Sequence, residues 1–247
     1  MSRPLTLITG ANQGIGLATA QILATKHNHH VLIGSRSIAA GEEVALSLRA
    51  QGHLATAIQI DLSSESSIKD AVATIEKEFG YLDVLINNAA VLLDGKTDMY
   101  TSTWDLYTKT FTPNVIGTGT LTETLLPLLC KAKKNPPTII FVSSIMGSIS
   151  VSQDSSTFWY ATDYKVYDAS KAAVNMLTVN YDRILKDVGG RVNCVCPGLV
   201  KSNLTGYTDY GTTTELGATR IVELATVGKE DEGVSGTFSN RDGGISW

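Results

Sequence analysis

Residues 5–16 read Leu5-Thr6-Leu7-Ile8-Thr9-Gly10-Ala11-Asn12-Gln13-Gly14-Ile15-Gly16. The apolar run at 5–9 has the character of a strand that is covered on both faces. Small residues follow it and allow a tight turn, after which a helix is expected to begin. Glycines let the backbone approach a pyrophosphate, and a helix N-terminus offers unpaired N–H groups. The stretch therefore predicts a strand–turn–helix unit that can bind phosphate.

Similar apolar runs recur along the chain and alternate with helical stretches. Strands are expected at residues 5–9, 30–35, 54–60, 82–87, 138–144, 191–196 and 236–238. One helix is expected at 39–50, and another over the apolar residues from Ile68 to Phe79, capped by Ser63 or Ser64 and stopped by Gly80. This alternation predicts an α/β fold: a Rossmann-type doubly wound parallel sheet of about seven strands with helices on both faces.

The composition is that of an ordinary globular protein. Of the 247 residues, 43% are hydrophobic and 18% are charged, which suits a sizeable core. The net charge of −4 argues against neutralising nucleic-acid phosphates, so we expect no nucleic-acid partner. No apolar run approaches the roughly 20 residues of a membrane span, and we find no secretory signal, so we expect no membrane partner and a cytoplasmic location.

The chain contains three cysteines, Cys130, Cys194 and Cys196. We interpret the last two as pointing to opposite faces of one strand, which disfavours a disulfide or a metal site. We therefore expect three reduced thiols and no metal, as is usual in the cytosol.

The end of the second expected strand carries the residues that select a dinucleotide. An NAD-selective site places a carboxylate there to hold the ribose 2′-hydroxyl. This chain has Ser35 and Arg36 instead. A guanidinium can pair with a 2′-phosphate and stack on adenine, so the pair predicts NADPH/NADP+ as the cofactor. The alternative is that Arg36 is a solvated surface residue.

Further motifs follow in order along the chain. They are T-G-x-x-x-G-x-G at residues 9–16, Asp61-Leu62 after the third strand, Asn87-Asn88-Ala89-Ala90 after the fourth, Asn114 in a long helix, Ser144 after the fifth strand, Tyr167-x-x-x-Lys171, and Pro197-Gly198 after the sixth. Together they resemble the short-chain dehydrogenase/reductase family, in particular its carbonyl-reductase-like branch, with Ala90 replacing the glycine of the family's N-N-A-G. The resemblance implies that residues 1–247 form a single NAD(P)-binding Rossmann-fold domain.

The resemblance also implies a cofactor site and a catalytic set. The cofactor residues that it implies are Gly10, Asn12, Gln13, Gly14, Ile15, Gly16, Ser35, Arg36, Asp61, Leu62, Asn88, Ala89, Ala90, Tyr167, Lys171, Pro197, Gly198, Val200 and Ser202. The catalytic residues that it implies are Asn114, Ser144, Tyr167 and Lys171. In this family Asp61-Leu62 holds the adenine, and backbone groups of Val200 contact the nicotinamide carboxamide.

Tyr167 is the proton donor that the resemblance implies. A free tyrosine titrates near 10, and Lys171 lies four positions later. On a helix the lysine ammonium shares a face with the phenol and can stabilise the phenolate. Neither Tyr160 nor Tyr164 has a lysine at this spacing.

Two more side chains complete the catalytic set. Ser144 is expected to hydrogen-bond the substrate oxygen, whereas its neighbour Ser143 faces the other way and is interpreted as satisfying backbone groups. Asn114 is expected to hold a water in a proton relay through Lys171. Pro113 removes a backbone donor and tends to kink a helix, which either exposes the Asn114 carbonyl or is simply tolerated.

These expectations lead to an NADPH-dependent ketone or aldehyde reductase with a small-molecule substrate. The alternatives are an NADP-dependent alcohol dehydrogenase working in the oxidative direction, a scaffold used for non-redox chemistry of secondary metabolism, and a dinucleotide-binding regulator without turnover. A bulky apolar or aromatic substrate is favoured by the side chains flanking the expected cleft: Met99, Tyr100, Trp104, Phe158, Trp159, Tyr160, Tyr207 and Tyr210.

Two segments are expected to shape this cleft. Residues 145–163 either wall the active site or cover an oligomer interface, and the choice between monomer and homo-oligomer stays open. Residues 199–214 are expected to act as a lid.

Overall fold

The computed structural model describes residues 3–133, 136–227 and 233–247. Eight strands form one sheet in the order β3-β2-β1-β4-β5-β6-β7-β8, and every neighbouring pair is parallel except β7–β8. The strands are β1 (Leu5–Thr9), β2 (His30–Ser35), β3 (Ala55–Gln59), β4 (Val84–Asn87), β5 (Thr138–Val142), β6 (Arg191–Val195), β7 (Phe238–Asn240) and β8 (Gly243–Gly244). The predicted Rossmann-type doubly wound sheet is confirmed, with one strand more than expected.

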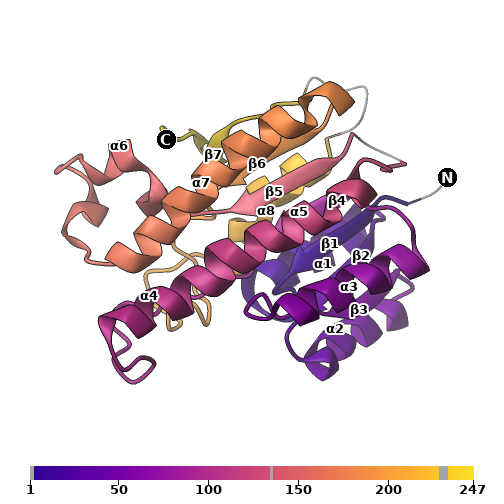
Figure 1. The fold of residues 1–247 in the computed structure, drawn as a ribbon, viewed down its shortest axis with the longest axis horizontal. Helices are drawn as coiled ribbons and strands as arrows, with labels where there is room; N and C mark the ends of the chain where they lie inside the picture. The colour runs from indigo at the N-terminus through magenta and orange to yellow at the C-terminus, as the bar shows by residue number, and fades with distance from the viewer. Residues whose placement is uncertain (1–2, 134–135, 228–232) are drawn as a thin grey trace.

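Helices cover both faces of the sheet (Figure 1). One face packs against α3 (Glu65–Glu78), α5 (Thr118–Leu129) and α7 (Lys165–Leu185), and the other against α1 (Gly14–Lys26), α2 (Ile38–Ala50) and α8 (Thr214–Ala225). Shorter elements complete the chain: α4 (Thr103–Phe111), a π-helical segment at Thr112–Gly117, α6 (Ile149–Ser152), and 3₁₀ turns at Ile145–Gly147, Phe158–Ala161 and Lys186–Val188.

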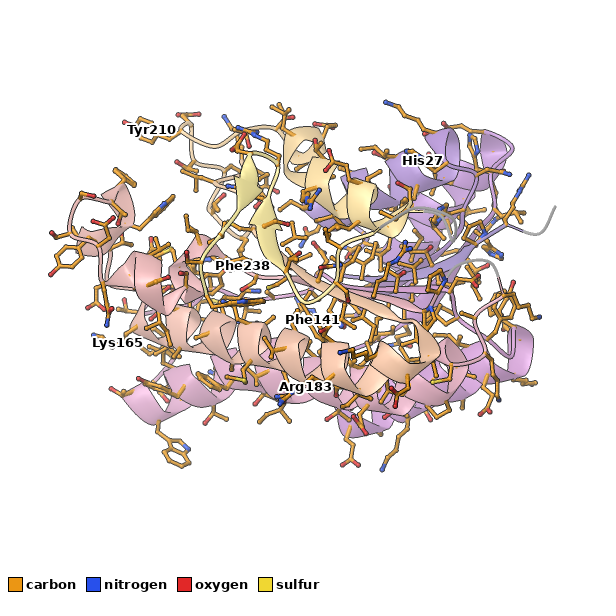
Figure 2. The ribbon with its side chains drawn as sticks, turned by 90° about the horizontal axis from the view of Figure 1, so that it is seen from above. His27, Phe141, Lys165, Arg183, Tyr210 and Phe238 are labelled. Carbon is orange, nitrogen blue, oxygen red and sulfur yellow. The ribbon has the colours of Figure 1, made fainter. Side chains whose placement is uncertain are left out.

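The continuous apolar runs become strands that are buried on both faces. Leu7 and Leu32 point into the core beneath α3, α5 and α7, while Ile8 and Ile33 point into the core beneath α1, α2 and α8. Phe141 lies deep in the molecule, as Figure 2 shows, and is fully buried. Because the central strands β1, β2, β4, β5 and β6 are buried on both faces, their interior positions exclude charged side chains, which explains why their sequences do not alternate between apolar and polar residues.

The predicted element boundaries are close to the observed ones. The first two strands coincide with the prediction, and the next four are shorter by one or two residues at one or both ends. The seventh is found at Phe238–Asn240 rather than at 236–238, and the two-residue β8 was not predicted. Ser64 is the N-cap of α3, where its side chain accepts a hydrogen bond from the Ser67 backbone N–H (3.3 Å), and Gly80 has a positive φ of 73° beyond the helix end.

The interpretation that Cys194 and Cys196 face opposite sides of a strand is wrong. Residues two positions apart share one face, and both cysteines belong to the core beneath α3, α5 and α7. Both are free thiols, as is Cys130. Burial raises the pKa of the Cys194 thiol to about 12, and the pKa of Cys196 is also raised by burial.

Within the described residues, no helix combines the length and the hydropathy needed to cross a membrane. The same part of the chain holds no group of three or more His, Cys, Asp or Glu side chains placed to bind a metal ion.

Gly117 allows the π-helical segment to approach the backbone of Leu62, in the loop that follows β3. A Cβ added at Gly117 would lie 1.9 Å from the Leu62 carbonyl oxygen. We therefore predict that Gly117→Ala lowers the free energy of unfolding by about 2–3 kcal/mol, as overpacking does. Gly119→Ala is the matched control, since its Cβ would make an ordinary 3.8 Å contact with Leu177.

In that control, replacing a helical glycine should be neutral or stabilise by up to about 1 kcal/mol. Urea unfolding of both variants measures the difference. Equal stabilities for the two variants would show that the chain relaxes freely at Leu62.

Candidate active site

The glycine turn after β1 is fastened to the end of β4. The Thr9 hydroxyl accepts hydrogen bonds from the backbone N–H groups of Asn88 and Ala89, each at 3.0 Å. The Asn88 side chain in turn donates to the Thr9 carbonyl at 2.8 Å. These bonds join two strand ends that lie side by side in the sheet. Thr9 was not among the predicted site residues, although it opens the glycine motif.

The glycines in this turn have different structural reasons. Gly10 and Gly14 adopt positive φ values of 65° and 58°, which favour glycine. Gly16 is needed for space, because its Cβ would lie 2.5 Å from the Gly10 carbonyl oxygen. The chain thus folds back tightly and starts α1 directly beside the turn. Gln13, the N-cap residue of α1, makes no side-chain capping bond.

A cavity of about 590 Å³ lies along this edge of the sheet. It is lined by most of the predicted cofactor residues: Gly10, Asn12, Gln13, Gly14, Ile15, Ser35, Arg36, Asp61, Leu62, Asn88, Ala89, Ala90, Tyr167, Lys171, Pro197 and Ser202. The predicted residues that do not line it are Gly16, Asn114, Ser144, Gly198 and Val200. Residues 145–163 contribute nothing to this cavity.

The two polar residues at the end of β2, Ser35 and Arg36, differ in solvent exposure. Ser35 is buried, whereas Arg36 is exposed and reaches the cavity. Ser37 begins α2 as its N-cap and accepts from the Ala40 N–H at 3.3 Å. Asp61, at the corresponding position after β3, accepts from the Ser63 N–H at 2.8 Å. The cavity therefore has a guanidinium at the position that would hold a carboxylate in an NAD-selective site.

Tyr167 and Lys171 lie in the first turns of α7 and are almost completely buried, with exposures of 6% and 3%. The Lys171 Nζ lies 5.6 Å from the centre of the Tyr167 ring and donates to the Val142 carbonyl at 2.8 Å. Burial lowers the pKa of Lys171 to about 8. Burial also raises the pKa of Tyr167, as do the nearby Cys196 and Asp168 groups.

The two adjacent serines after β5 have separate partners. Ser144 forms a side-chain hydrogen bond with Tyr167 that lowers the pKa of the phenol, and its Oγ also accepts from the Met146 N–H at 3.2 Å. The Ser143 Oγ donates to the Asn175 Oδ1 at 2.7 Å. Ser143 is therefore held by a side chain of α7 as well as by the Lys171 carbonyl (3.3 Å). Of the two serines, Ser144 affects the pKa of the phenol, whereas Ser143 lines the cavity.

Asn114 lies in a long helical stretch, as predicted, and stands in the π-helical segment that interrupts the α-helical geometry between α4 and α5. Pro113 explains the interruption, because it has no N–H to give to the preceding turn. The Asn114 Oδ1 accepts from the Val91 N–H at 2.8 Å, and its Nδ2 donates to the Val91 carbonyl at 2.9 Å and to the Ser170 Oγ at 3.1 Å. Both side-chain donors of Asn114 are therefore used within the fold.

Asp94 is a structural residue of the site that was missed in the sequence. It is buried, with 7% exposure, in the loop after β4. Its Oδ1 accepts from the Val166 N–H at 3.0 Å and its Oδ2 from the Tyr167 N–H at 3.1 Å. Tyr164, the N-cap of α7, makes no side-chain capping bond. Asp94 thus caps the helix from 73 residues away in the chain.

The aromatic residues expected around the cleft are mostly directed outward. Trp104, Phe158 and Tyr210 are 83%, 81% and 92% exposed, and Figure 2 shows Tyr210 at the periphery. Met99 lines the cavity, together with the apolar side chains of Leu93 and Leu204. Lys96 bridges the two loops that carry these residues, because its Nζ donates to the Leu204 carbonyl at 3.4 Å.

We predict that Asp94→Ala loosens the start of α7. Two N–H groups lose a charged acceptor, so the free energy of unfolding should fall by about 2 kcal/mol or more. Amide hydrogen exchange at Val166 and Tyr167 should accelerate. Asp98→Ala, an exposed residue of the same loop, is the control and should change neither measurement. Unaltered exchange in Asp94→Ala would rule out the capping role.

Comparison with known proteins places this geometry. The family model described as short chain dehydrogenase matches residues 4–211. The short-chain dehydrogenase/reductase eupG of Phoma sp is 35% identical over 224 residues, which cover 81% of this chain and 78% of eupG. The short-chain dehydrogenase anuI of Penicillium roqueforti is 34% identical over 235 residues, covering 94% and 92%.

Solved structures agree with the sequence comparison. A crystal structure of NADPH-bound carbonyl reductase from chicken fatty liver is similar over 100% of both chains, with a TM-score of 0.82 and 26% identity. The chain therefore belongs to the short-chain dehydrogenase/reductase family of oxidoreductases.

Proposed function

We propose that this protein is an NADPH-dependent carbonyl reductase in which Tyr167 protonates the oxygen of a ketone or aldehyde. The observation that carries the proposal is the buried Tyr167–Lys171 pair, which lines the same cavity as the glycine turn. Carbonyl reduction needs a hydride at carbon and a proton at oxygen. A phenol that lies beside an ammonium and lines the cavity for the dinucleotide can supply the proton at the place where the hydride arrives.

Several features of the chain fit NADP(H). The first turn of α1 contains no acidic residue. In the glycine turn, Gly10 and Gly14 line the cavity and put no side chain between it and the helix N-terminus. Such a helix start suits a pyrophosphate. Arg36 lines the cavity where a 2′-phosphate would lie, with Ser35 beside it. The chicken carbonyl reductase with a similar fold has NADPH bound.

The residues of this chain would handle the proton. When bound, NADPH would supply the hydride. Because burial raises the pKa of Tyr167, the phenol stays protonated near neutral pH and has a proton to give. The Lys171 ammonium stabilises the phenolate that forms, and the Ser144 hydroxyl stabilises charge on the substrate oxygen. Since both Asn114 side-chain donors are used, a water relay at Asn114 would rely on its main-chain carbonyl.

The substrate end of the cavity is apolar. Leu93, Met99 and Leu204 line the cavity that Tyr167 also lines. Apolar walls with a few polar groups are typical of sites for bulky organic ligands. This supports a substrate with an apolar or aromatic body. A panel of ketones, aldehydes and quinones screened by NADPH absorbance identifies it.

We predict that Tyr167→Phe abolishes most carbonyl reduction, since the proton donor is lost and the ring is kept. A loss of about 100-fold or more in kcat is expected, with the Kd for NADPH nearly unchanged. Tyr164→Phe is the matched control, because Tyr164 lies on the same segment without a lysine four positions on. Full activity in Tyr167→Phe would refute the assignment.

We predict that Arg36→Asp reverses the preference between cofactors. The carboxylate would repel a 2′-phosphate and could hold a ribose hydroxyl, so kcat/KM for NADPH should fall by about 10- to 100-fold while that for NADH changes little. Arg183→Asp makes the same charge change at the far end of α7 (Figure 2) and should leave the ratio alone. An equal loss for both cofactors would mean that Arg36 does not contact the phosphate.

A further inference from the structure

A second, smaller cavity lies beneath the segment that follows Ser144. Its volume is about 160 Å³. It is lined by Ile145, Met146, Val151, Ser152, Trp159, Tyr160, Thr162 and Asp168. Ile145 directly follows Ser144, and Asp168 directly follows Tyr167. This cavity is therefore lined by the two residues that directly follow Ser144 and Tyr167 in the sequence. It shares no lining residue with the larger cavity.

The carboxylate of Asp168 is the unusual feature of this second cavity. Its Oδ1 is fully buried, and no described residue donates a hydrogen bond to it. Burial raises the pKa of this carboxyl to about 7, and the charges of Asp94 and Asp163 add to the effect. A buried acceptor without a donor is costly to a fold. An external hydrogen-bond donor would relieve that cost.

The walls around Asp168 are suited to an aromatic ring. Trp159 and Tyr160 lie on the segment that covers the cavity, and Trp159 is held edge-on against Phe158 with the ring centres 5.2 Å apart. Ile145, Met146 and Val151 supply apolar surface. Whole-ligand pockets measure about 300–1,000 Å³, so a cavity of 160 Å³ suits one ring or a short arm.

We propose that this second cavity binds a hydroxyl- or amine-bearing arm of the carbonyl substrate, with the donor directed at Asp168. The proposal rests on the proposed reductase function for its context, since the substrate carbonyl would lie at Tyr167. It assigns a specificity role to residues 145–163: they wall a substrate subsite. Asp168 acts there as the acceptor that distinguishes donor-bearing arms from plain hydrocarbon arms.

The first test measures binding without turnover. The probe is 4-ethylphenol, whose affinity is measured by titration followed by the NMR shifts of the protein. Asp168→Leu should weaken its binding by about tenfold or more, because the hydrogen bond to the Asp168 carboxyl is lost. Asp168→Asn keeps the side-chain shape and one acceptor oxygen, and should give an intermediate affinity.

Asp154→Asn is the matched control for this titration. It removes one acidic charge from the same segment, but Asp154 is exposed, accepts from the Ser156 N–H at 2.9 Å and does not line the cavity. It should bind the phenol as the unaltered protein does. Equal affinities in the unaltered protein and Asp168→Leu would overturn the subsite.

The second test uses a matched pair of ketones, 4-(4-hydroxyphenyl)butan-2-one and 4-phenylbutan-2-one, with NADPH. The ratio of their kcat/KM values should favour the hydroxyl-bearing ketone by about tenfold and fall towards one in Asp168→Leu. A ratio that is the same in both proteins would overturn the subsite even if both ketones are reduced. If neither ketone is reduced but 4-ethylphenol binding depends on Asp168, the subsite stands and the reductase proposal must be revised.

Discussion

The buried ammonium of Lys171 is the constraint on which the site depends. A charged group with 3% exposure is costly unless the fold supplies an acceptor, and here the Val142 carbonyl at the end of β5 accepts from Nζ at 2.8 Å. The bond draws the start of α7 against the carboxyl edge of the sheet. It also fixes the ammonium near the Tyr167 ring. Burial, which disfavours the charged form, lowers the pKa of the lysine to about 8. The fold therefore retains a buried ammonium, although burying this charge does not by itself stabilise the protein.

The cavity lies at the carboxyl edge of the sheet, where the order of the strands changes direction between β1 and β4. β1 and β4 are neighbours, and the strands that follow each of them extend the sheet in opposite directions. Crevices form at such switch points in open parallel sheets. The bonds between Thr9 and Asn88 close the bottom of the crevice, so the glycine turn cannot drift away from the β4 end. One wall of the cavity thus comes from the first half of the chain, and the Tyr167–Lys171 wall comes from the second.

The sequence predicted those features whose cause is local. Continuous apolar runs revealed the strands, Ser64 revealed a helix start, and the spacing of Tyr167 and Lys171 placed both on one helical face. It missed β8, because two glycines have no side chains that could show a period. It also missed Asp94, whose two partners lie more than 70 residues away, so no local pattern indicates a cap. Asp168 was passed over for the same reason: its burial depends on a segment that folds over it.

The loop after β4 ties these parts together. The backbone N–H and carbonyl of Val91 each form a hydrogen bond with the Asn114 side-chain amide. Asn114 donates to the Ser170 hydroxyl, which donates to the Tyr167 carbonyl at 2.7 Å, while Asp94 of the same loop accepts from the Tyr167 N–H. The Tyr167 N–H is therefore held by Asp94 of this loop, and the Tyr167 carbonyl by Ser170 of α7, which Asn114 contacts in turn. Movement of the Tyr167 backbone relative to the end of β4 would break these bonds. The π-helical turn that contains Pro113 is the backbone geometry in which Asn114 makes its two bonds to Val91.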